Sequence, residues 1–173
     1  RAGLNYRMTD LEAAIGREQL KKLDKIRKKR FEIYTELKEL FKKNLSAFRF
    51  WESIPGAEPN PWFCFVHIDR SKIKEDNPTI SEALKAEGLV VGAHYTTPMT
   101  QAKWLLEKNT FGESHLPWTL PGARNVKYEG TCPNAEKALE DHLTFYMNEN
   151  WKAKEIKDSL KAFQKIENFY MSK

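Results

Sequence analysis

Two short polar stretches carry side chains that could bind a small anionic molecule. In the first, Asn5 and Arg7 flank Tyr6 shortly before Thr9 and Glu12, whose spacing is that of a capping box at the start of a helix. Backbone N–H groups at a helix N-terminus favour an anion, and a guanidinium adds a bidentate donor for phosphate or carboxylate. The sequence therefore predicts an anion-binding lead-in. The alternative is that Asn5 forms a turn and Arg7 a surface ion pair.

His94 and Tyr95 form the second stretch. They follow an apolar run from Leu89 to Ala93 and open a long irregular segment, where binding sites are often built. Two other histidines have structural explanations. His67 lies inside a predicted strand, and His142 ends a predicted helix, where a cation suits the helix dipole. Of these three histidines, we expect only His94 to take part in a site.

Several other kinds of site lack a signature in the sequence. There is no glycine-rich phosphate loop, no nucleophile motif and no pair of histidines at helical metal-binding spacing. Cys64 and Cys132 lack metal-ligand spacing, and we expect two free thiols in a reducing cytosol. No apolar run approaches the roughly 18 residues of a membrane span, and we expect no signal peptide. We therefore expect a cytoplasmic protein without a metal site.

The excess of positive charge is local. The chain has a formal net charge of +5, and lysine and arginine are concentrated between Arg17 and Arg30. A nucleic-acid surface is one interpretation and a solvated helix face is the other. No aromatic platform interleaves these cations, and no recognised nucleic-acid motif accompanies them. The solvated face is favoured, and nucleic acid is not expected as a partner.

One long helix, from about Thr9 to Lys43, must position the first stretch. Apolar residues recur mostly three or four apart, which is a helical period, at Leu11, Ile15, Leu20, Leu23, Ile26, Tyr34, Leu37 and Phe41. At 1.5 Å per residue this helix is roughly 50 Å long. A helix of this length is expected to form the spine of a domain or of an interface.

The remaining elements predict an α/β fold with a small sheet of about three to four strands covered by helices. Strands are expected near Phe48–Trp51, Trp62–Ile68, Leu89–Ala93 and Leu143–Met147. Helices are expected from Thr79 to about Gly88, from Pro133 to about His142, and after Asn150 as its cap. Residues 96–130 are irregular, with a short helix near Gln101–Lys108. We divide the chain into residues 1–44, the lead-in and linking helix, and residues 45–173, a small α/β domain.

Three stretches carry a resemblance to a known family. Residues 3–16 closely resemble the opening of the C-terminal part of the DegT/DnrJ/StrS-type sugar aminotransferases. Residues 84–95, which include Gly92-Ala93-His94-Tyr95, resemble that family's glycine-then-His-Tyr segment. Residues 132–136, residues 143–147 and the last helix resemble its closing segment. The resemblance spans nearly the whole chain in order, except for residues 101–127. Thr96 and Thr100 stand where the family often has Pro and His.

The resemblance implies the small C-terminal domain of an aspartate aminotransferase-type fold and pyridoxal 5'-phosphate as cofactor. An amino group would move from glutamate or glutamine to a nucleotide-linked keto-sugar or a keto-cyclitol. Asn5 would reach across a homodimer interface to the cofactor phosphate of the other subunit. Arg7 would assist in binding anionic substrate groups, and His94 and Tyr95 would line the substrate mouth.

The family's Schiff-base lysine, pyridine-nitrogen aspartate and ring-stacking aromatic all lie upstream of the motif that Asn5 and Arg7 belong to. We therefore expect no catalytic residue in this chain, an absent large cofactor-binding domain, and no aminotransferase activity from the chain alone. Two alternatives stay open. One is a family member that is not a transaminase, of the sugar dehydratase or aminohydroxybenzoate synthase type. The other is a non-catalytic binding or regulatory module that uses the basic helix.

Overall fold

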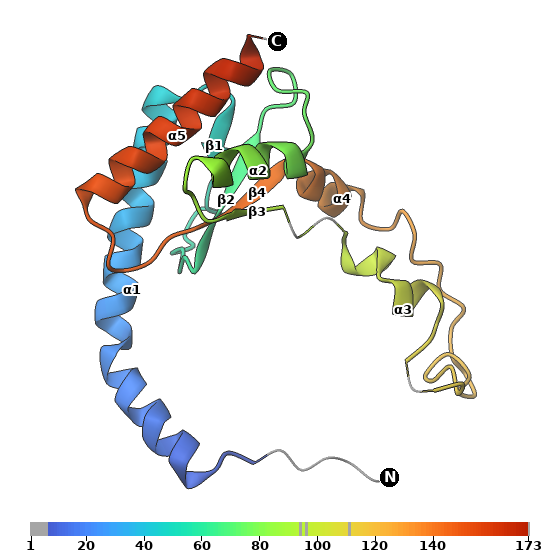
Figure 1. Ribbon diagram of the computed structural model, residues 1–173. Coiled ribbons are helices and arrows are strands. Elements are labelled where there is room, and N and C mark those ends of the chain that lie inside the picture. The colour runs from blue at the N-terminus through green and yellow to red at the C-terminus, as the bar shows by residue number, and fades with distance from the viewer. Residues whose placement is uncertain (1–6, 94, 96, 111, 173) are drawn as a thin grey trace.

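A four-stranded antiparallel sheet lies at the centre of the molecule (Figure 1). The computed structural model describes residues 7–93, 95, 97–110 and 112–172. The strands are ordered β1-β2-β4-β3 and comprise β1 (Phe48–Phe50), β2 (Phe63–Ile68), β4 (His142–Tyr146) and β3 (Val91–Gly92). The α/β prediction with a small sheet is confirmed. Asn5 and His94 lie outside the described residues.

The helices α1, α2 and α5 cover one face of this sheet, and the short helix α4 lies near its other face (Figure 1). The C-terminal part of α1 packs on β1 and on α5, and α2 packs on β3 and α5. The helical elements are α1 (Asp10–Asn44), α2 (Asn77–Ala86), the 3-10 turn η1 (Met99–Gln101), α3 (Lys103–Leu106), α4 (Pro133–Glu140) and α5 (Ala153–Met171). Within the described residues, no helix combines the length and apolar character needed to cross a membrane.

The capping box at the start of α1 forms as predicted. The Thr9 hydroxyl accepts from the Glu12 backbone N–H, and the Thr9 N–H donates to the Glu12 carboxylate at 2.7 Å. Only the last third of this helix enters the core, through Ile33, Leu37 and Phe41. The remainder extends away from the sheet as a long arm (Figure 1).

Aromatic rings fill the core between the sheet and the helices. Phe41 of α1 and Phe163 of α5 meet edge to face, with ring centroids 4.8 Å apart. Phe163 also contacts Phe48 of β1 at 5.1 Å and Phe145 of β4 at 5.4 Å. This cluster joins both long helices to the sheet, so the three elements form one hydrophobic core.

Two predicted helix caps are wrong. Helix α2 begins at Asn77 because the Asp76 carboxylate accepts from the Thr79 N–H at 2.8 Å, so Asp76 and not Thr79 is the cap. Helix α5 begins at Ala153, and the N–H of Lys152 donates to Glu155 at 2.8 Å. The N–H of Asn150, the predicted cap, donates instead to the Asn148 side chain.

The predictions for His142 and for β3 also need correction. His142 is the first residue of β4, and it does not end the preceding helix. Its Nδ1 still lies 3.0 Å from the Leu139 carbonyl, so it binds the end of α4 from the strand. Strand β3 is shorter than the predicted Leu89–Ala93, because the Leu89 N–H donates to the Leu84 carbonyl at the end of α2.

Candidate functional site

The sheet face opposite α1 and α5, here called the outer face, carries a group of aromatic rings. Side chains alternate along a strand, so Cys64, Val66 and Ile68 enter the core while Phe63 and Phe65 point the other way. Neighbouring segments add further rings to the same face at Trp51, Tyr95 and Tyr146.

Tyr95 belongs to this aromatic group. Its ring stacks on Phe63, with centroids 6.1 Å apart and planes at 29°, and it contacts Phe65 at 6.4 Å. Tyr95 is 46% exposed, so it is anchored on one side and open on the other. The ring of this predicted substrate residue thus packs against the outer face from the segment that follows β3, and the sheet supports it as it would a binding side chain.

A pocket of about 270 Å³ opens on the outer face, between the sheet and α4. Trp51, Phe65, Ala138, Leu139 and His142 line it. The rings of Phe65 and His142 lie 5.1 Å apart. The pocket is therefore apolar, bordered by aromatic rings, and next to Phe65, which also touches Tyr95.

His67 lies beside this pocket. Its ring meets Trp51 edge to face at 5.9 Å. Burial lowers the pKa of His67, and the nearby positive charge of Arg49 lowers it further, against weaker opposing effects of Asp141 and Asp69. Its Nδ1 is buried with no hydrogen-bond partner among the described residues. Burial therefore favours the neutral form of the His67 ring, which packs against Trp51.

Arg7 lies far from the outer face within this chain. It precedes α1, whose N-terminal end lies at the opposite end of the molecule from the sheet (Figure 1). The first turn of α1 carries the carboxylates of Asp10 and Glu12. These negative charges offset the positive end of the helix dipole, so the helix end itself does not favour an anion, and Arg7 is the cation that the prediction relies on.

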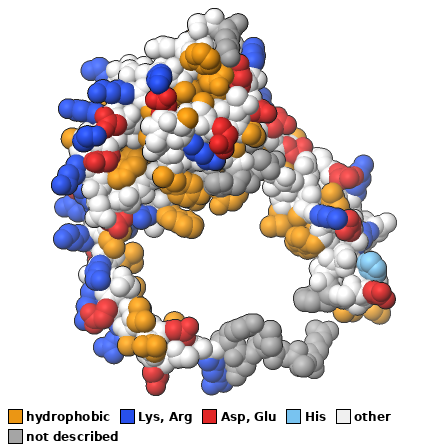
Figure 2. Space-filling model, viewed as in Figure 1, with side chains coloured by type: hydrophobic (Ala, Val, Ile, Leu, Met, Phe, Trp, Pro, Cys, Tyr) orange, Lys and Arg blue, Asp and Glu red, His pale blue; other side chains and the backbone are white. Residues whose placement is uncertain are grey.

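Hydrophobic side chains face a broad hollow between the long arm of α1, the outer face and the irregular segment (Figure 2). The exposed apolar residues of α1 include Leu11, Ile15, Leu20 and Leu23. Lysine and arginine occupy the outer side of the same helix in this view. Several of those cations are paired with carboxylates, including Arg27 with Glu58 at 2.8 Å. The basic stretch thus has the character of a solvated helix face.

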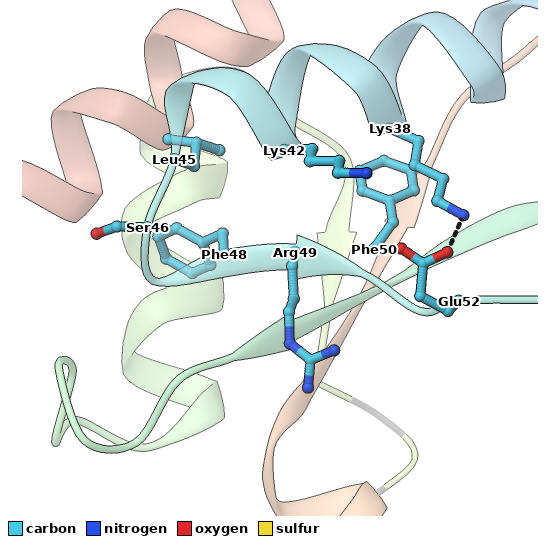
Figure 3. A pocket seen from close by; sticks show the side chains of 8 residues that line it. All are labelled: Lys38, Lys42, Leu45, Ser46, Phe48, Arg49, Phe50 and Glu52. Carbon is cyan, nitrogen blue, oxygen red and sulfur yellow. Dashed lines mark hydrogen bonds and ion pairs between the residues drawn. The ribbon is translucent and has the colours of Figure 1, made fainter.

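A second pocket, of about 300 Å³, lies between the end of α1 and β1 (Figure 3). Lys38 and Glu52 pair across it at 2.6 Å, and this contact raises the pKa of Lys38 and lowers that of Glu52. The Arg49 side chain points away from Lys42 (Figure 3). These charges do not converge on one point, so the pocket lacks the geometry of an anion site.

The outer aromatic group and its pocket were missed by sequence reasoning. Residues 62–66 are an almost unbroken apolar run, which is typical of a strand buried on both faces. The signal that remained was a ring at every second position of the strand, Phe63, Phe65 and His67, between side chains that are aliphatic or small.

No complete cofactor site forms within the described residues. Asn5 and His94 lie outside them. Arg7 precedes the end of α1 that extends away from the sheet (Figure 1), whereas the ring of Tyr95 packs on Phe63 of the sheet. The described residues also contain no group of three histidine, cysteine, aspartate or glutamate side chains able to hold a metal ion.

Comparison with known proteins gives one family and a set of similar folds. Residues 1–164 match the model of the DegT/DnrJ/EryC1/StrS aminotransferase family. S. venezuelae DesV is similar in structure, with a TM-score of 0.72 at 18% identity over 96% of this chain and 38% of that chain. Helicobacter pylori PseC, an aminotransferase involved in the biosynthesis of pseudoaminic acid, gives 0.72 at 19% identity over 98% and 40%. DesI, solved in the presence of its TDP-sugar product, has a TM-score of 0.69 at 14% identity, over 95% of this chain and 37% of that chain. The chain thus spans about two fifths of the length of each of these proteins.

Proposed function

The chain belongs to the DegT/DnrJ/EryC1/StrS aminotransferase family, and we propose that it is the small domain of a pyridoxal-phosphate-dependent sugar aminotransferase. The family match over residues 1–164 carries this proposal. The position of Tyr95 on the outer aromatic face supports it, because a substrate mouth needs binding side chains on a rigid support.

In this proposal the chain contributes binding residues and no catalytic residue. Arg7 binds anionic groups of the substrate, and His94 and Tyr95 line the substrate mouth. Asn5 contacts the cofactor phosphate of the partner subunit in a homodimer. The cofactor, when bound, supplies an electron sink for amino-group transfer. The described residues do not form its site by themselves, so we propose that a large domain provides the remaining groups.

We propose a nucleotide-linked keto-sugar as the amino acceptor and glutamate or glutamine as the donor. Two similar structures support a sugar substrate, since one enzyme acts in pseudoaminic acid biosynthesis and another was solved with a TDP-sugar product. A keto-cyclitol is the second acceptor to test. Both acceptors present a ring with hydroxyl groups, which an exposed tyrosine on an aromatic support can contact.

Kinetics of the full-length protein test this function. Formation of 2-oxoglutarate from glutamate is measured against acceptor concentration in the wild-type protein and in Tyr95→Ala. We expect acceptor-dependent turnover, with the KM for the acceptor raised about tenfold in the variant and the KM for glutamate nearly unchanged. Trp104→Ala, a change to an exposed ring on α3, serves as the control.

Absence of acceptor-dependent turnover with either donor would contradict the proposal. Sugar dehydration without nitrogen transfer would assign the protein to the non-transaminase members of the family. The 173-residue chain alone is expected to show no turnover and no stoichiometric lysine adduct with pyridoxal phosphate after borohydride reduction.

A further inference from the structure

The apolar pocket on the outer face is lined by partly exposed aromatic rings that a flat ring could stack on. Trp51 and Phe65 are 41% and 40% exposed, and Ala138 and Leu139 of α4 complete the wall. The volume of about 270 Å³ is just below the range of about 300 to 1,000 Å³ that is usual for ligand pockets. The space therefore suits one ring system of a ligand better than a whole substrate.

The walls of the pocket are held in place before any ligand arrives. The Nδ1 of His142 lies 3.1 Å from the Ala138 carbonyl and 3.0 Å from the Leu139 carbonyl, which fixes the imidazole against the end of α4. Trp51 rests edge to face on His67 at 5.9 Å. A preorganised apolar wall with aromatic faces favours stacking of a planar ring at little cost in side-chain entropy.

A cation lies on the same face of the sheet as this pocket, opposite His67 in the pairing of β1 with β2. Arg49 precedes Trp51 by two residues, so both side chains project to the same face of the sheet. Figure 3 shows the Arg49 side chain pointing away from α1, toward this outer face. No ion pair to Arg49 forms within the described part of the chain. Its guanidinium can therefore bind an anionic group of a ligand that occupies the pocket.

The pocket also adjoins Tyr95. Phe65 contacts His142 inside the pocket at 5.1 Å and Tyr95 outside it at 6.4 Å. One ligand can therefore place a flat ring in the pocket, an anion near Arg49 and a further group near Tyr95. Planar ring, phosphate and sugar are the three parts of a nucleotide-linked sugar.

We propose that the pocket lined by Trp51, Phe65, Ala138, Leu139 and His142 binds the base of the nucleotide, with Arg49 binding its phosphate. This inference rests on the proposed function, in which the acceptor is a nucleotide-linked sugar. It assigns the base to the small domain itself. Stacking on aromatic rings is tolerant of base identity, so the pocket recognises a nucleobase as a class.

Calorimetric titration of the 173-residue chain with uridine 5′-diphosphate, uridine and inorganic pyrophosphate tests the pocket. We expect the diphosphate to bind and Trp51→Ala to weaken its binding between about fivefold and 150-fold, the range for loss of one base-stacking ring. Leu139→Trp, which fills the pocket instead of emptying it, is expected to weaken binding to a similar extent. Trp104→Ala, which removes a 46% exposed ring outside the pocket, should leave the affinity unchanged.

The variant Arg49→Gln tests the contribution of the phosphate to the affinity separately from that of the base. It should weaken binding of uridine 5′-diphosphate about threefold and leave binding of uridine unchanged, as expected for a solvent-exposed ion pair. Inorganic pyrophosphate that binds as tightly as uridine 5′-diphosphate would overturn the inference, because the base would then contribute nothing to the affinity. Unchanged diphosphate affinity in both Trp51→Ala and Leu139→Trp would overturn it too.

The inference and the proposed function fail in different ways. Diphosphate binding that depends on Trp51, in a full-length protein without amino transfer, would support the pocket and contradict the function. Amino transfer with a KM for the nucleotide-linked sugar that is the same in wild type and Trp51→Ala would support the function and overturn the pocket.

Discussion

The Glu167 carboxylate accepts a 2.8 Å hydrogen bond from the backbone N–H of Ala47, although both residues are buried. The same carboxylate accepts from the N–H of Ser46 at 2.9 Å and from its hydroxyl at 3.2 Å. Helix α5 thereby holds the turn that joins α1 to β1. Since Arg49 and Trp51 follow directly on this turn, Glu167 positions one side of the outer face without touching it.

Loss of this acceptor is expected to destabilise the fold. Glu167→Ala leaves the buried N–H of Ala47 and the partly buried N–H of Ser46 without this acceptor, which we expect to cost about 2 kcal/mol of the free energy of unfolding. Glu167→Gln keeps one acceptor oxygen and should cost less. Urea denaturation measures both. Glu32→Ala, at an exposed carboxylate paired with Lys29, should change stability by less than about 0.5 kcal/mol. An equal effect of Glu167→Ala and Glu32→Ala would contradict the role of Glu167.

The two thiols should differ sharply in reactivity. Burial raises the pKa of Cys64 to about 12, whereas Cys132 is exposed at the start of α4. The thiolate is the reactive form, so Cys64 is protected both by its pKa and by inaccessibility. A disulfide reagent should modify one thiol in the native chain and the second only after unfolding in urea. Rapid modification of both thiols under native conditions would show that the core around β2 opens readily.

His67 should make stability depend on pH. Burial lowers its pKa in the folded state below the ordinary value of about 6.5, so the folded state binds fewer protons than the unfolded state in that range. The contribution of His67 is therefore fully present above about pH 6.5 and is lost as pH falls toward its folded-state pKa. The loss of unfolding free energy between about pH 7.5 and pH 5 should be smaller in His67→Gln. The same loss in His67→Gln as in wild type would exclude this cause, and His115→Gln, at an exposed loop, serves as the control.

The exposed stripe on α1 should promote association. A whole number of helical turns separates Ile15 from Ile33, so the exposed start of the helix continues the face that its other end buries. Leu11 is 72% exposed and Ile15 is 55% exposed. Such an apolar stripe tends to find a second surface, and we expect a dimer or larger species in sedimentation equilibrium.

Substitutions on the stripe test that expectation. The double variant Leu11→Glu and Ile15→Glu should shift the chain toward a 20.2 kDa monomer. Asp24→Asn, on the solvated face of the same helix, should not. A wild-type chain that sediments as a monomer at high micromolar concentration would show that the stripe has no partner in a second copy.

Local patterns in the sequence predicted most of the elements. The capping box of Thr9 and Glu12 forms within one turn, and the run of aromatic and β-branched residues that predicted a strand lies within β2. The predicted start of α2 was wrong because two capping signals overlap there. Asp76 satisfies the Thr79 N–H, and Pro78 suits the first turn of a helix that begins before Thr79.

These local patterns could not predict contacts between segments that are distant in the sequence. Glu167 meets Ala47 across 120 positions of sequence, and nothing local marks it as an acceptor for a buried turn. The pocket joins Trp51 and Phe65 to the end of α4, which only the sheet register brings together. Tyr95 was predicted from its place in a motif, while its support by Phe63 follows from the pairing of β3 and β2 with β4.

Transfer of nitrogen-15 tests the central claim most directly. The full-length protein is incubated with nitrogen-15 glutamate, or with amide-labelled and amino-labelled glutamine, and a nucleotide-linked keto-sugar, and the sugar product is analysed by mass spectrometry. The account predicts an amino sugar that carries the label, formed in equal amount to the keto acid from the donor. An unlabelled sugar, whether dehydrated or unchanged, with every donor and acceptor would contradict it.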